Sequence, residues 1–186
     1  LLDTPGHQDF SEDTYRTLTA VDSAVMVLDA AKGIEAQTRK LFEVCRLRDI
    51  PIVTFINKMD REAQDPIELL DEIASKLALD PAPLYWPAGS GGRFKGMLDL
   101  RNQQFLPFAK KTADNKDEGH PAAIGFAGNA VSSYLNPDER AELEETAMLV
   151  GEASKPFDPQ AFLEGHMTPV FFGSALRHFG IDQLLE

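Results

Sequence analysis

Two short polar clusters in this sequence each follow an apolar segment of strand character. The first comprises residues 3–7, and the second, residues 57–60, follows the apolar run 51–56. In an open α/β sheet, ligands bind outside the carboxyl ends of the strands. We therefore expect the two clusters to face one site, although each taken alone also fits an ordinary strand-to-helix turn.

Apolar runs and amphipathic segments alternate over residues 1–79. The unbroken apolar run 24–28 suits a parallel strand that is covered on both faces. A capped helix start is expected at Asp65, with Pro66 at the first helical position. Helices are expected over residues 11–21, over residues 36–49 and from residue 66 onward. In the second of these, an apolar stripe is expected at or near Leu41, Val44, Cys45 and Leu47. The order strand, helix, strand, helix, strand, helix predicts a doubly wound α/β fold.

The pattern changes at Asp80, where proline and glycine become frequent. Residues 97–108 have hairpin character, residues 110–120 are polar, and Asn136 starts a helix that runs to Val150. Strand character returns at residues 168–172. We expect three parts: a core over residues 1–79, an α+β insertion over residues 80–167, and a last strand and helix over residues 168–186.

The first cluster has a chemical interpretation at the charged end of a nucleotide. Asp3 can hold a magnesium ion through water, because magnesium keeps several waters and takes few carboxylates. Gly6 lets a backbone N–H approach a terminal phosphate closely. His7 is placed beside an attacking water, and a role as a structural cap is its alternative.

The second cluster has an interpretation at a purine base. Asn57 offers a side-chain amide to the purine edge, and the stem of Lys58 can lie over the base. The Asp60 carboxylate can accept hydrogen bonds from the ring N–H and the exocyclic amine of guanine. Adenine lacks that donor pair, so an unpaired carboxylate penalises it.

These motifs resemble a known family. Asp-Thr-Pro-Gly-His at residues 3–7, together with Asn-Lys-Met-Asp at residues 57–60, is similar to the G domain of the translational GTPases. The segments that resemble more narrowly the bacterial peptide chain release factor 3 family are residues 9–18, 31–33, 85–87 and 93–96. The resemblance is clear over residues 1–96 and 168–186, and it is loose between them.

The resemblance implies a doubly wound P-loop GTPase-type sheet that binds GTP and GDP with magnesium. It implies GTP hydrolysis stimulated by the ribosome in the cytoplasm, and recycling of the release factors that read stop codons. His7 becomes the catalytic residue and Asp3 the magnesium site, through water. The implied GTP contacts are Asp3, Thr4, Pro5, Gly6, His7, Asn57, Lys58, Met59, Asp60, Ser174, Ala175 and Leu176. Residues 174–176 would donate backbone N–H groups to the guanine keto oxygen.

One part of such a domain does not occur in this sequence. No Gly-x-x-x-x-Gly-Lys-Ser/Thr is present, and the glycine cluster at residues 89–92 lacks the Gly-Lys-Ser/Thr that must follow. In the family that loop precedes position 1. We therefore expect a G-domain fragment that is incomplete at its N-terminus, binds GDP poorly and is inactive alone.

The net charge of the chain indicates which kinds of partner its surface can attract. The net charge of −12 and the absence of a Lys/Arg-rich run give no direct RNA-binding patch, because RNA attracts basic surfaces. If the protein works on the ribosome, its main RNA contacts are expected elsewhere in a longer chain, or an acidic face could instead meet basic ribosomal or factor proteins; the sequence does not decide between these. The single cysteine, Cys45, is expected to be a buried thiol in a reducing cytoplasm, and no membrane span is expected.

Two alternative functions stay open. The whole protein could be of the elongation factor G or ribosome-protection type, or the chain could be a non-hydrolysing interaction module. Tyr85 and Trp86 are expected to pack in the core where the insertion meets the α/β frame, rather than to form a binding platform. His120, His166 and His178 lack metal-ligand spacing, so they are expected to be ordinary surface or core residues.

Overall fold

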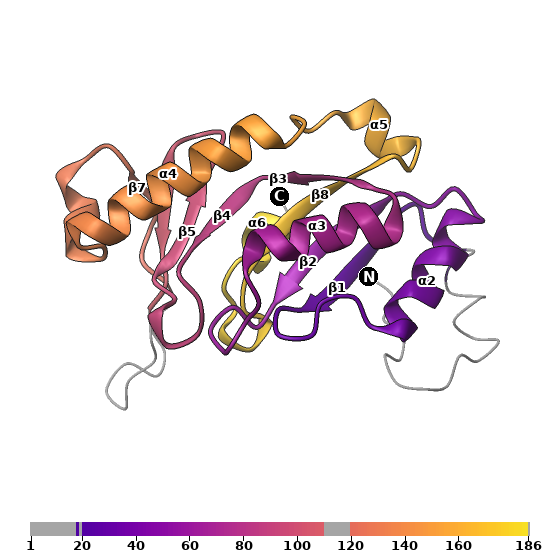
Figure 1. Ribbon diagram of the computed structural model, residues 1–186, viewed down its shortest axis with the longest axis horizontal. Helices are drawn as coiled ribbons and strands as arrows, with labels where there is room; N and C mark the ends of the chain where they lie inside the picture. Colours follow the sequence, from indigo (N-terminus) through magenta and orange to yellow (C-terminus); the bar gives the residue numbers. More distant parts are fainter. Residues whose placement is uncertain (1–17, 19, 110–119, 186) are drawn as a thin grey trace.

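A parallel sheet and an antiparallel sheet form the frame of the protein (Figure 1). The computed structural model describes residues 18, 20–109 and 120–185. The parallel sheet has the strand order β1-β2-β8-β3, and the antiparallel sheet has the order β4-β5-β6-β7. The strands are β1 Ala24–Asp29, β2 Ile52–Asn57, β3 Asp80–Pro83, β4 Tyr85–Ala88, β5 Gly96–Asp99, β6 Gln104–Pro107, β7 Ile124–Gly125 and β8 Met167–Phe172.

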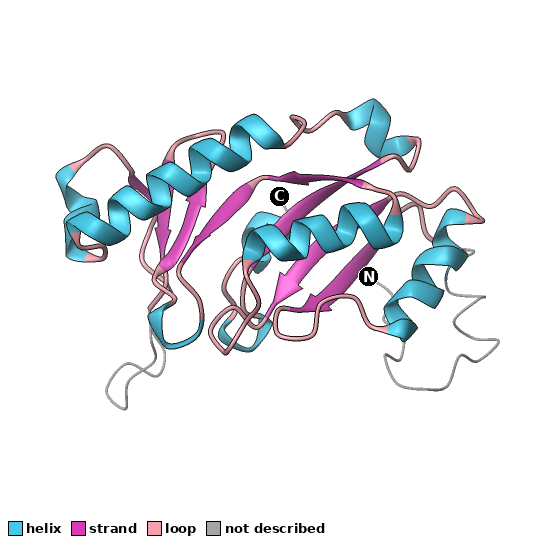
Figure 2. Ribbon diagram, viewed as in Figure 1, coloured by secondary structure: helices cyan, strands magenta, loops and turns pink. Residues whose placement is uncertain are grey.

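Helices connect these strands and cover the sheets, as Figure 2 shows. The α-helices are α2 Ala36–Arg46, α3 Pro66–Leu77, α4 Pro137–Ala153, α5 Pro159–Leu163 and α6 Ile181–Leu185. Short 3₁₀ turns are η1 Gly91–Arg93, η2 Asn129–Ser133 and η3 Ala175–Arg177. Helix α3 lies over the parallel sheet, and α4 runs along the antiparallel one (Figure 1). No described helix is both long and apolar enough to cross a membrane.

Local sequence signals place the starts of α3 and α4 correctly, whereas the helix expected over residues 11–21 falls largely outside the described residues. The Asp65 side chain accepts a hydrogen bond from the Ile67 N–H at 2.7 Å and so caps α3. Asn136 and Glu139 form a reciprocal capping box at the start of α4. The ends are less well predicted, because α2 stops at Arg46, three residues before the expected end, and α4 continues to Ala153.

Two burial expectations are wrong. The run 24–28 forms strand β1 as expected, but Val25 and Val27 are 46% and 55% exposed, so one face of this edge strand is open in the structure. Leu47 was expected near the buried stripe of α2; it follows the end of that helix and is exposed, whereas Phe42 is buried. Cys45 is buried as expected, and its burial raises the pKa of the thiol.

One hydrophobic core runs through both sheets. Trp86 packs edge-to-face on Phe172 of β8 with ring centroids 5.6 Å apart, and Tyr85 lies 5.8 Å from Phe171. These two residues are therefore core residues at the junction of the sheets, as expected. The expected hairpin is formed by β5 and β6. Strand β3 pairs with β8 in the parallel sheet, so the proposed division at residue 80 separates it from the sheet that it completes.

Glu72 of α3 ties this helix to the loop after β1. Its carboxylate accepts a hydrogen bond from the Ile34 N–H at 2.9 Å and forms an ion pair with Lys76. Burial opposes the charged form, but the Lys76 and Ile34 hydrogen bonds outweigh it, and the pKa of Glu72 is lowered from its ordinary value. A lowered carboxyl pKa stabilises the fold above the unfolded-state pKa, and this contribution is lost as the pH falls through the folded-state pKa.

Glu72→Gln is therefore expected to lower the free energy of unfolding by about 1 to 2 kcal/mol at neutral pH. The difference from the parent protein should shrink as the pH falls from the ordinary pKa of a glutamate through the lowered folded-state pKa, because the native carboxylate becomes protonated over that range. Urea unfolding at a series of pH values measures this. Asp71→Asn on the exposed side of the same helix is the matched control, and an equal loss in that variant at every pH would contradict the assignment.

Candidate functional site

The carboxyl ends of β1, β2 and β8 lie together at one edge of the parallel sheet. Asp29 at the end of β1 is the register partner of Asn57 at the end of β2. Just past β8, the Gly173 N–H donates to the Ile56 carbonyl at 2.9 Å, and its carbonyl accepts from the Met59 N–H at 3.0 Å. The loop after β2 and the loop after β8 are thus bonded to each other.

Asn57 is the centre of this arrangement. Its side-chain oxygen accepts the Lys58 N–H and the Ala175 N–H, both at 2.8 Å, and Ala175 is 118 residues away in the sequence. The side-chain nitrogen of Asn57 has no partner in the described part of the chain. One amide therefore joins two loops through its oxygen and keeps two N–H donors for a ligand.

Lys58 is held by Asp29. It adopts a left-handed backbone conformation with φ 71°, and its Nζ lies 2.6 Å from Asp29 Oδ2. Desolvation by partial burial raises the pKa of Asp29, but the hydrogen bonds from Lys58 and the Ala31 N–H outweigh it, so the pKa is lowered. The Lys58 ammonium is thus fixed to the end of β1, while nearly half of its side chain stays exposed.

Asp60 contributes a hydrogen-bond acceptor to this end of the sheet, and the loop after β8 contributes a donor. The Asp60 side chain is 12% exposed, and its Oδ2 lies 3.8 Å from Nε of Arg177. In this loop the Ser174 N–H is donated to the Phe179 carbonyl and the Ala175 N–H to Asn57. The Leu176 N–H has no hydrogen-bond partner among the described residues. This site can therefore accept hydrogen bonds at Asp60 and donate one at Leu176.

Ser174 and Met59 contribute from inside the protein. The Ser174 Oγ is fully buried and has no hydrogen-bond partner in the described structure. Such an unpaired buried hydroxyl is uncommon in folded proteins. The Met59 side chain is fully buried in the core, and its carbonyl accepts the Gly91 N–H at 2.9 Å. Met59 therefore positions the loop after β2 and presents no side chain to a ligand.

The first predicted cluster cannot be placed. Asp3, Thr4, Pro5, Gly6 and His7 all lie outside the described residues. Within the described ranges, no group of three His, Cys, Asp or Glu side chains could hold a metal ion. The expected meeting of residues 3–7 with Asp60, and the magnesium site at Asp3, therefore stay predictions.

Comparison with protein families decides the class. The family model of the elongation factor Tu GTP binding domain matches residues 1–186. The chain belongs to this family. The predicted fold class, a P-loop GTPase-type α/β sheet, is thereby confirmed, and the strand-end site described above lies in a GTP-binding domain.

Curated relatives narrow the resemblance. The chain is 50% identical over all 186 residues to proteins named peptide chain release factor 3 from Synechococcus elongatus, Microcystis aeruginosa and Cyanothece sp.. This confirms the narrower resemblance noted in the sequence. The chain spans about a third of the length of these relatives, 33% to 34%.

Two residues of the GTP-binding domain's site were not anticipated. Asp29 ends an apolar strand just as Asn57 does, so the rule that singled out Asn57 could also have found it. Nothing in the sequence marks Arg177 as a site residue. It follows no strand end directly, and only the fold places it beside Asp60. The individual nucleotide contacts of residues 57–60 and 174–176 remain predictions.

Proposed function

We propose that this chain is the guanine-nucleotide-binding part of a GTP-hydrolysing translation factor. The observation that carries the proposal is the hydrogen bond from Ala175 N–H to Asn57 Oδ1, which joins the two predicted base-binding loops. Guanine has two adjacent donors, the ring N–H and the exocyclic amine, beside a keto acceptor. Asp60 matches the donors, and the unpartnered Leu176 N–H matches the keto oxygen.

The charged end of the nucleotide is assigned to the first cluster. Asp3 assists a magnesium ion through water, Gly6 contacts the terminal phosphate through its N–H, and His7 orients the attacking water. Phosphoryl transfer needs mostly positioning and charge neutralisation, which such residues can supply. Release of the segment around Gly6 after hydrolysis would give a conformational switch.

The whole protein is proposed to recycle stop-codon-reading release factors from the ribosome in the cytoplasm. The names of the curated relatives and the segments that resemble them support this over an elongation factor G or ribosome-protection role. Hydrolysis without the ribosome is expected to be slow.

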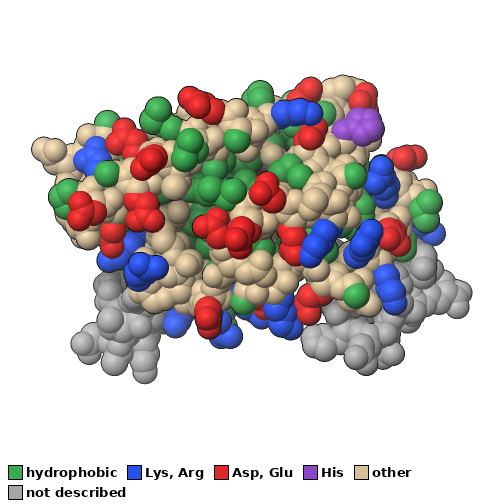
Figure 3. Space-filling model, viewed as in Figure 1, with side chains coloured by type: hydrophobic (Ala, Val, Ile, Leu, Met, Phe, Trp, Pro, Cys, Tyr) green, Lys and Arg blue, Asp and Glu red, His purple; other side chains and the backbone are tan. Residues whose placement is uncertain are grey.

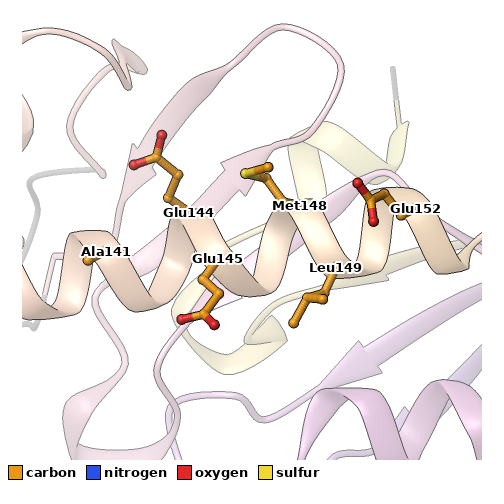
Figure 4. Close-up of a pocket in the computed structure, with 6 residues that line it drawn as sticks. All are labelled: Ala141, Glu144, Glu145, Met148, Leu149 and Glu152. Atoms are coloured by element: carbon orange, nitrogen blue, oxygen red, sulfur yellow. The ribbon is translucent and has the colours of Figure 1, made fainter.

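The surface favours basic protein partners over RNA. Helix α4 exposes Met148 and Leu149, 63% and 53% exposed, among the carboxylates of Glu144, Glu145 and Glu152 (Figure 4). Figure 3 shows acidic side chains spread over this face together with Lys and Arg side chains, and the chain as a whole carries a net charge of −12. An acidic face repels phosphates and attracts Lys- and Arg-rich surfaces, so the proposed ribosomal contacts of this segment are with basic proteins.

The test is a termination assay with the full-length protein. Ribosomes stalled at a stop codon and a limiting amount of a stop-codon-reading release factor should release peptide for one round only. Adding the full-length protein with GTP should restore multiple rounds, because the release factor is recycled. Stimulation of translocation in place of recycling would instead support the elongation factor G type.

A further inference from the structure

Arg177 lies where the proposed guanine site needs an unobstructed carboxylate. Its guanidinium Nε is 3.8 Å from Asp60 Oδ2. In the described part of the chain, no other hydrogen bond or ion pair reaches the Asp60 carboxylate. The guanidinium of Arg177 therefore approaches one of the two oxygens that guanine is proposed to use.

The backbone of Arg177 is fixed, although its side chain is partly free. The Arg177 N–H donates to the Ser174 carbonyl at 3.0 Å. Its carbonyl is 2.7 Å from Nε2 of His120, whose Nδ1 is 3.2 Å from the Ala109 N–H. A backbone N–H can only donate and a carbonyl can only accept, so the His120 Nδ1 is the acceptor and Nε2 carries the proton.

His120 in turn belongs to an aromatic cluster. It stacks on Phe108 at 5.4 Å and meets Phe179 edge-on at 4.8 Å. Phe108 and Phe179 both contact Phe94, at 5.0 and 5.6 Å. These contacts link the backbone of Arg177, through His120, to Phe94 between η1 and β5 and to Phe108 just after β6. The backbone that carries the Arg177 guanidinium is thus held in place by hydrogen bonds and by the ring contacts of His120.

We propose that Arg177 is a positioning residue that competes with guanine for the Asp60 carboxylate and so limits nucleotide affinity and association rate. In the nucleotide-free protein it keeps the carboxylate paired. When guanine arrives, the Arg177 side chain, already 38% exposed, swings into water and leaves both Asp60 oxygens to the base. The inference rests on the proposed guanine site and adds a residue that sets its strength.

Removing the Arg177 guanidinium is expected to raise the affinity for GDP by a small factor. A partly exposed ion pair contributes little, and the apparent dissociation constant scales inversely with the fraction of protein that is free to bind. Arg177→Gln in the full-length protein should therefore bind GDP about threefold more tightly, mainly through faster association. The gain should diminish at high salt, because salt screens the Arg177–Asp60 pair in the parent protein.

Stopped-flow binding of a fluorescent GDP measures both rates, and thermal unfolding checks that the variant folds. Arg61→Gln is the matched control: it removes a positive charge next to Asp60 in the sequence, and no ion pair of its side chain is found in the described structure. Removing a cation should leave the affinity for an anionic nucleotide unchanged or lower it. We therefore expect Arg177→Gln to raise the affinity for GDP, and Arg61→Gln to lower that affinity or leave it unchanged.

A second comparison tests whether the effect of Arg177→Gln on nucleotide binding requires the Asp60 carboxylate. Xanthosine diphosphate is the probe for the Asp60→Asn protein, with and without Arg177→Gln. Asparagine carries no charge for Arg177 to hold, so the second substitution should change nothing there. Weaker or unchanged GDP binding by Arg177→Gln, or an equal gain in the Asp60→Asn background, overturns the inference. A parent protein that shows no guanine preference would instead refute the proposed function.

Discussion

Asp60→Asn in the full-length protein is expected to transfer the nucleotide preference from guanine to xanthine. The carboxylate accepts two hydrogen bonds from guanine, and hydrogen bonds to a charged group contribute about 1.5–3 kcal/mol each. Guanine-nucleotide affinity should fall about 10³-fold as the two are lost. Xanthine carries a carbonyl where guanine carries its amine, so the new amide N–H finds an acceptor. Competition between GDP and xanthosine diphosphate measures the change.

The position of Asp60 makes this substitution informative. Its backbone is fixed by the neighbouring Met59, whose N–H donates to Gly173, so the side chain alone changes. Glu62→Gln is the control, since it removes an exposed carboxylate two residues away. Unchanged guanine preference in Asp60→Asn would remove Asp60 from the base site, whereas a similar change in Glu62→Gln would point to a general charge effect.

The 186-residue chain expressed alone is expected to bind GDP at least about 10³-fold more weakly than the full-length protein. The base-binding loops are present and joined by Asn57. The sequence contains no phosphate loop, whose backbone N–H groups and lysine would bind the inner phosphates. Loss of two or three charge-assisted hydrogen bonds accounts for a factor of about this size. Isothermal titration calorimetry of both proteins with GDP gives the two affinities.

Folding must be checked in the same samples, because an unfolded chain would also fail to bind. Circular dichroism with a cooperative melt establishes that the isolated chain is folded. Tight GDP binding by the folded short chain would show that the base end alone suffices. Weak binding by both proteins would favour the interaction module that the sequence also allowed.

The sequence predicted most of the elements because their signals are local. Asp65 and Asn136 cap the helices that they were expected to start, and the apolar runs 24–28 and 52–56 lie in strands. Exposure was harder to predict. Val25, Val27 and Leu47 are apolar and fit their patterns, yet whether they are covered depends on which elements pack against them.

For the candidate site, too, some features could be predicted from the sequence and others depended on the tertiary structure. The sequence by itself determined the chemistry at the strand ends, since an amide and a carboxylate at residues 57–60 follow a strand whatever its neighbours are. Only the tertiary structure decided that β2 lies between β1 and β8, which places Lys58 on Asp29, Asn57 on Ala175 and Arg177 beside Asp60. Strand order depends on how both faces and all edges of a sheet are buried together, and this is a property of the whole chain that no single segment carries.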